Sequence, residues 1–212
     1  MYMIDLPTAV RDLEPLTVLL YEGFEGGLSV TREFFETHGA PICKHLGPAI
    51  VRWYVKRFLS DRGHVVQELQ QQDMNNNGLG MRFQPYYLRI WKSDDGQLPY
   101  PGQSRTKRDF LYQAAYIPFR WNWSPPKTNL VFLWSTDSEY QGLQLYLACP
   151  KENPAQEGAV ATEWGPHPLE HPVMRRTAPA LSEPPVIDLP YEYKNDSEVE
   201  GHDLGGTGAT GA

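Results

Sequence analysis

The chain has 212 residues, of which 41% are hydrophobic and 12% aromatic, and this composition suits one packed globular domain. It contains no run approaching the roughly 18 apolar residues of a membrane span, and no N-terminal secretory signal, so we expect a cytoplasmic protein without a membrane partner. Its two cysteines, Cys43 and Cys149, exclude a disulfide framework and a cysteine-based zinc site, and the sequence predicts no cofactor.

The first third of the chain is predicted to be helical. Apolar residues at helical spacing predict a first helix: Val10, Leu13, Leu16, Leu20 and Phe24. Pro15 should kink this helix, and Gly26-Gly27 should end it. A short helix capped by Ser29 should follow and close at Gly39.

The next helix is the best defined in the sequence. Pro48 suits its first position, and an apolar stripe follows: Ile50, Val51, Tyr54, Val55, Phe58 and Leu59. Asp61 is then predicted to cap one more helix, and residues 70–72 to be its fraying end.

The middle third is predicted to contain strands. Residues 86–92 are rich in aromatic and β-branched side chains, and a helix capped by Ser104 follows them. Residues 117–123 are predicted to form a short strand. The apolar run 130–134 and the alternating segment 143–149 favour two strands joined in a β-hairpin.

The chain changes character after Pro150. Residues 151–212 are rich in proline and acidic side chains, so we interpret them as a largely extended or disordered tail, with Trp164 and Tyr191 as its anchors. Residues 1–150 are expected to form a single domain of the α+β class, in which an N-terminal helical layer packs on a small, mainly antiparallel sheet.

The formal net charge of −7 is distributed unevenly along the chain. Residues 1–40 carry a net −5, residues 41–127 a net +7 and residues 128–212 a net −9. This asymmetry suggests a charged partner for the basic middle segment. The alternative is that the acidic ends lie against the basic middle within one molecule.

The strongest candidate site lies at the start of the helix that Ser104 caps. This cap places Arg105, Lys107 and Arg108 in the first turn, where unpaired N–H groups carry partial positive charge and acidic residues are usual. Three cations there favour an anion or an acidic protein surface nearby. Arg89, on the preceding strand, could join them in one basic patch.

The favoured function is therefore a non-catalytic binding or regulatory module. Its basic patch would hold an anionic ligand, nucleic acid or an acidic protein surface, and the acidic segment 190–212 could mask the same patch. A further hypothesis is a protein-interaction subunit that contacts its partner through Trp121 and Trp123.

The alternative is a metal-dependent phosphodiesterase or nuclease. Asp94, Asp95 or Asp137 would hold the metal near Lys92, because carboxylates at strand ends are suitable metal ligands. The sequence also matches an HxxEH pattern between His167 and His171, but Pro168 inside it disfavours the helix that zinc binding would need. No set of residues meets the geometric requirements of catalysis, so we favour binding over enzymatic activity.

Overall fold

The helices lie mainly in the N-terminal third of the chain and the strands follow, which confirms the predicted α+β class. The computed structural model describes residues 4–72, 74, 78–100, 102, 104–113, 128–151 and 160–171. Its helices are α1 (Leu6–Asp12), α2 (Glu14–Thr37), α3 (Leu46–Arg62), a 3₁₀ turn η1 (Gly63–Val65) and α4 (Arg105–Leu111). Its strands are β1 (Gln70–Gln72), β2 (Leu79–Phe83), β3 (Tyr86–Lys92), β4 (Thr128–Thr136), β5 (Leu143–Pro150) and β6 (Thr162–Pro168).

The six strands form one sheet in the order in which they occur in the sequence. All neighbouring pairs are antiparallel except β3 and β4, which run parallel, so the prediction of a mainly antiparallel sheet is confirmed. A parallel pair needs a connection that crosses from one end of the sheet to the other, and α4 lies in that connection. The predicted hairpin is the antiparallel pair β4 and β5.

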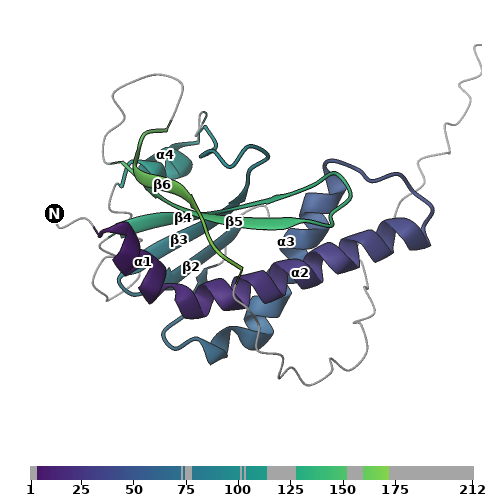
Figure 1. Ribbon diagram of the computed structural model, residues 1–212, viewed down its shortest axis with the longest axis horizontal. Coiled ribbons are helices and arrows are strands. Elements are labelled where there is room, and N and C mark those ends of the chain that lie inside the picture. The colour runs from purple at the N-terminus through teal and green to yellow at the C-terminus, as the bar shows by residue number, and fades with distance from the viewer. Residues whose placement is uncertain are drawn as a thin grey trace, which may run out of the picture. The chain divides into compact units, whose positions relative to one another are not determined.

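Helices cover both faces of the sheet (Figure 1). The larger core lies between the sheet and helices α1–α3, and its largest fully buried side chains include Trp134, Tyr21, Tyr86 and Phe24. A smaller core lies between the sheet and α4, and it is built from Tyr87, Phe110, Leu111, Val131 and Leu133. Alternation along β3 divides its side chains between the two cores.

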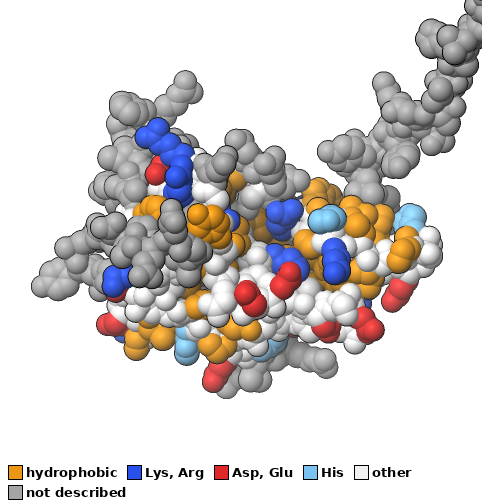
Figure 2. All heavy atoms as spheres, turned by 90° about the horizontal axis from the view of Figure 1, so that it is seen from above, with side chains coloured by type: hydrophobic (Ala, Val, Ile, Leu, Met, Phe, Trp, Pro, Cys, Tyr) orange, Lys and Arg blue, Asp and Glu red, His pale blue; other side chains and the backbone are white. Residues whose placement is uncertain are grey.

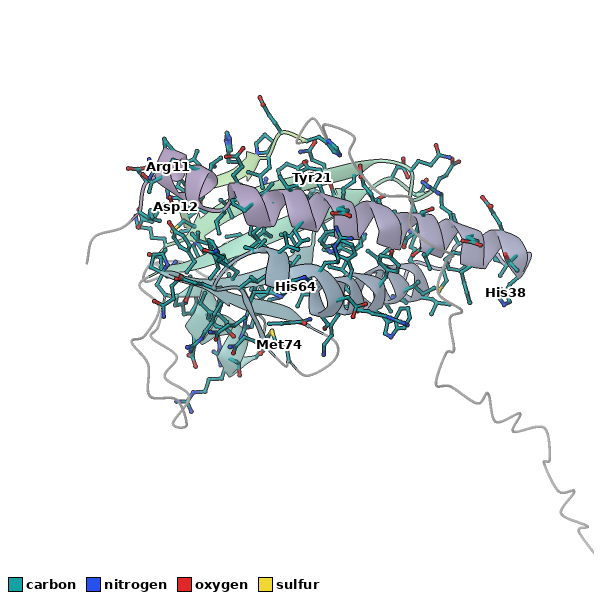
Figure 3. All side chains as sticks on the ribbon, turned by 90° about the horizontal axis from the view of Figure 1, so that it is seen from below. Arg11, Asp12, Tyr21, His38, His64 and Met74 are labelled. Atoms are coloured by element: carbon teal, nitrogen blue, oxygen red, sulfur yellow. The ribbon has the colours of Figure 1, made fainter. Side chains whose placement is uncertain are left out.

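Helix α2 is continuous, whereas the sequence predicted a break at Gly26-Gly27. The glycines occur where α3 packs closely: a Cβ at Gly23 would lie 2.8 Å from Phe58, and one at Gly26 would lie 2.7 Å from Tyr54. Their small size permits this contact, and the packing offsets the roughly 1 kcal/mol that a glycine costs within a helix. Figure 3 shows the length of α2, with Tyr21 along it and His38 beyond its end.

Two further expectations for the first half were wrong. No separate helix begins at Asp61, because α3 continues to Arg62 and ends in η1. Residues 70–72 form β1 instead of a helix end, since they pair with Gly80–Arg82 of β2, a strand that the sequence did not predict. Three glutamines carry little local preference for a strand, and their conformation depends on the partner strand.

The sheet extends beyond residue 150. Strand β6 pairs antiparallel with β5, and Trp164 packs against the larger core. The Trp164 indole N–H donates to the Ile4 carbonyl at 2.9 Å, and the Tyr21 hydroxyl donates to the Leu169 carbonyl at 2.8 Å. These contacts join the α1 and α2 segments to β6, and they agree with the prediction that Trp164 is an anchor. The predicted strand 117–123 and the anchor Tyr191 lie outside the described residues.

None of the helices in the part of the chain that the structure describes is both long and apolar enough to cross a membrane. This finding agrees with the absence of a long apolar run in the sequence.

We predict that Gly47→Ala destabilises the fold by about 1–3 kcal/mol through overpacking. A Cβ at Gly47 would lie 2.5 Å from Cζ of Tyr140, whose side chain is 4% exposed and cannot move aside without disturbing the core. Gly63→Ala is the matched control, because its Cβ would be 3.5 Å from the nearest atom and its φ is −59°. Urea denaturation should show a lower midpoint for Gly47→Ala alone, and equal midpoints would contradict the packing argument.

Candidate site on the α4 face of the sheet

The cap predicted for α4 is present. The Ser104 hydroxyl oxygen accepts the Lys107 backbone N–H at 3.3 Å, and helical residues begin at Arg105. Phe110 and Leu111 are buried against the sheet. Lys107 precedes them by three and four positions, so these three side chains share the sheet-facing side of α4.

Arg105 and Arg108 lie on the exposed side of the same helix. The Arg105 side chain is 90% exposed, and its Nε is 3.9 Å from the carboxylate of Asp109 one turn later. Figure 2 shows Lys and Arg side chains standing out over α4, with an acidic side chain beside them. The structure therefore does not bring all the predicted site residues together, because two of the three cations point away from the sheet.

Lys107 instead lies over an aromatic ring of the sheet. Its ammonium nitrogen is 5.3 Å from the centre of the Trp91 ring, and it donates to the Tyr100 carbonyl at 2.8 Å. Burial, and secondly the charge of Arg89, lower the pKa of Lys107 below its ordinary value. Arg89 lies over the Phe110 ring and Lys107 over the Trp91 ring, and these two rings are 5.6 Å apart, so both cations belong to one cluster.

Arg89 is the most unusual side chain of this region. It lies on β3 and is only 5% exposed, and its guanidinium carbon is 4.6 Å from the centre of the Phe110 ring and 5.9 Å from that of Tyr87. Its Nε is buried and has no hydrogen-bond partner. Most buried arginines are paired with a carboxylate, because removing the charge from water costs several kcal/mol.

We call Arg89 and Lys107 the cationic pair. Within the described ranges, no carboxylate lies within ion-pair distance of either side chain. Trp91, Phe110 and Tyr87 contribute aromatic rings around it. The arrangement can hold an anion between a rigid planar donor on the sheet and a mobile ammonium group on the helix.

The sequence contained a signal that Lys107 lies on a different side of α4 from Arg105 and Arg108. Residues 107, 110 and 111 have the spacing of one helical face, whereas 105, 108 and 109 have the spacing of another. Alternation along the strand likewise puts Arg89 and Trp91 on a common face, as the structure has them. The sequence could not indicate that the guanidinium would be covered by Phe110, because that contact joins two elements.

The carboxylates of the alternative hypothesis do not converge. Asp95 accepts from the Ser93 hydroxyl and the Gln97 backbone N–H, and Asp137 accepts from the backbone N–H groups of its own loop. Asp94 forms an ion pair with Lys92. The described residues contain no group of three or more His, Cys, Asp or Glu side chains that could hold a metal ion. This geometry gives no support to a metal-dependent nuclease.

The HxxEH residues do not form a helix. His167 lies in β6, and the Nε2 of His171 lies 2.8 Å from a Glu25 oxygen on α2, with its ring 4.6 Å from that of Tyr21. The two histidines therefore lack the one-turn spacing that the metal-binding pattern requires.

A groove of about 290 Å³ lies near this contact, lined by Glu25, Leu28, Arg32, Gln141 and Leu143. Both of its charged side chains already have partners. Glu25 contacts His171, and Arg32 donates to the Tyr140 carbonyl at 2.8 Å. The groove therefore offers less unbalanced charge than the cationic pair does.

The two cysteines differ in environment. Cys149 is buried, and this burial raises the pKa of its thiol to about 12. Cys43 is exposed just before α3, and the backbone N–H groups of Leu46 and His45 donate to its sulfur and lower the pKa of its thiol. Both are free thiols.

Comparison of the chain with protein-family models, curated proteins and solved structures finds no match. The candidate site therefore depends on the geometry of this molecule alone. Among the described residues, the cationic pair combines a buried guanidinium with a neighbouring ammonium group and has no carboxylate within ion-pair distance.

We predict that Cys43 alone reacts with iodoacetamide in the native protein. The thiolate is the reactive form, so the labelling rate should reach half its maximum below the ordinary thiol pKa. Intact-protein mass spectrometry should show one adduct in the native protein and two after denaturation. The Cys43→Ser variant is the control, and a native adduct on Cys149 would contradict the structure.

Proposed function

We propose that this protein is a non-catalytic cytoplasmic binding or regulatory module that takes an anionic ligand at the cationic pair. Arg89 and Lys107 would contact the ligand directly. The other predicted site residues would have a lesser role. Arg105 is exposed and paired with Asp109, and Arg108 is exposed. The Ser104 hydroxyl already accepts the Lys107 backbone N–H. The cytoplasmic location is supported by the two free thiols.

The observation that carries this proposal is the buried guanidinium of Arg89. The two aromatic contacts of Arg89 contribute on the order of 0.5–2 kcal/mol each. Burial of an ion costs several kcal/mol, and the neighbouring ammonium of Lys107 adds repulsion. A bound anion would offset both costs, whereas the charge balance of the described residues does not.

Lys107 gives this pair a route to solvent. It is partly exposed, whereas Arg89 is buried beneath Phe110. In this proposal an anion first meets the ammonium group of Lys107 and then contacts the guanidinium. This order suits a binding site, because the exposed charge attracts the ligand and the buried one holds it.

We predict that Lys107→Ala weakens anion binding about ten- to a hundredfold, the effect expected when a charge-assisted hydrogen bond is lost. Isothermal titration calorimetry at low salt would measure this with three probes: inorganic phosphate, a 20-nucleotide single-stranded DNA and a polyglutamate peptide. At least one should bind the native chain, and its affinity should fall as salt is raised.

Arg105→Ala is the matched control for this experiment. It removes one cation from the same helix, but the side chain is exposed and paired with Asp109. Its effect should be less than about twofold, as is usual for exposed pairs. Binding of none of the three probes, or equal losses in the two variants, would refute the proposed site.

A further inference from the structure

We infer that the ligand of the cationic pair carries a phosphomonoester, that is, a phosphate group with one ester bond and two ionisable oxygens. This inference rests on the proposed function and makes it more specific. It is drawn from the number of charges in the site, the donors they present and the way they are enclosed.

The charge count favours a dianion. Arg89 and Lys107 together carry two positive charges in a partly desolvated place. A carboxylate or a phosphodiester supplies one negative charge, whereas a phosphomonoester supplies close to two at neutral pH.

The donors also match the terminal oxygens of such a group. The guanidinium offers parallel N–H groups in a fixed plane, which suit two oxygens of one phosphate. The ammonium group of Lys107 is a single point of charge that suits a third oxygen. A phosphomonoester has three terminal oxygens that can accept these bonds at once.

The enclosure argues against the backbone of a nucleic acid. A strand that passes over the protein needs cations spread along an open surface, so that successive phosphates are each neutralised. Here the cations of α4 are divided between two sides of the helix, and Arg105 is paired with Asp109. The cationic pair itself is a single focus between a sheet and a helix, with Arg89 covered by the Phe110 ring.

The surroundings of the pair give a clean titration test. Among the described residues, the charged or titratable side chains of this face are two tyrosines and an arginine from the sheet and one tyrosine after α4, besides the pair itself: Tyr87, Tyr146, Arg82 and Tyr112. None of these is a histidine or a carboxylate. A pH dependence between pH 5 and pH 8 would therefore report the ligand, whose second pKa is about 6.

The test is calorimetric titration of the full chain with phenyl phosphate at low salt from pH 5 to pH 8. The affinity should fall about tenfold between pH 7 and pH 5, because a group with a second pKa near 6 loses about that share of its dianion. Diphenyl phosphate and phenyl sulfate, which are monoanions throughout this range, should bind more weakly and with a flat pH profile.

Variants of the two cations then test whether phenyl phosphate binds at the cationic pair. Arg89→Lys keeps the charge but removes the planar donor, and it should weaken phenyl phosphate binding about tenfold while leaving the thermal unfolding transition in place. Lys107→Ala, at a partly exposed position, should also weaken it. If Arg89→Lys does not fold, Lys107→Ala still decides the question, and Arg105→Ala should change the affinity by less than about twofold.

The outcomes separate the two proposals. If diphenyl phosphate or single-stranded DNA binds as tightly as phenyl phosphate and without pH dependence, the phosphomonoester inference is wrong but the anion site remains. If phenyl phosphate binds and Lys107→Ala has no effect, the inference is also wrong. If no anion binds the native chain at all, both proposals fail.

Discussion

The parallel pairing of β3 with β4 is the constraint on which the rest of the α4 face depends. Two parallel strands cannot be joined by a tight turn, so the chain must cross the sheet between them, and α4 lies in that crossing. The crossing takes α4 to the face opposite the three earlier helices, where it buries Phe110 and Leu111 (Figure 1). Lys107, on the same side of the helix, is thereby brought over Trp91 on β3. A simple hairpin between these strands would leave Arg89 without this cover.

Two amide side chains hold the end of α4 against the sheet. The Gln113 amide donates to the carbonyls of Asn129 and Pro150, and its oxygen accepts the Asn129 backbone N–H at 2.7 Å. The Asn129 side chain donates to the Phe110 carbonyl at 2.9 Å. These bonds satisfy backbone groups at the helix end and at the beginning of β4. They also limit how far α4 can move, so the backbone of Lys107 is held over the sheet while its flexible side chain can adjust.

The sequence predicts those features of the fold that short stretches of the chain encode by themselves. The apolar stripe of α3, the strand at β5 and the cap of α4 follow from local patterns, and the structure confirms each of these elements, although the last four residues of β5 are buried on both faces. The continuity of α2 is different, because it depends on α3 packing against Gly26. The conformation of β1 likewise depends on β2. Long-range packing and pairing decide such features, so no window of sequence contains them.

The candidate site was predictable to a similar extent. Helical spacing and strand alternation together place Lys107 and Arg89 on surfaces that can meet, but the parallel register that makes them meet is not visible in either segment. The reason for expecting a ligand also changes. The sequence pointed to the positive end of a helix, yet α4 has seven residues and its first cation has a carboxylate one turn away.

The contacts of α4 do not compensate the charge of Arg89, which lies beneath this helix. The ring contacts of Arg89 recover on the order of 1–4 kcal/mol in all, against a desolvation cost of several kcal/mol and the repulsion from Lys107. A side chain chosen for packing alone would be uncharged at this position, because an apolar residue fills such a space without that cost. We therefore propose that a bound anion compensates the guanidinium between Phe110 and β3, because its ring contacts do not offset the cost of its desolvation.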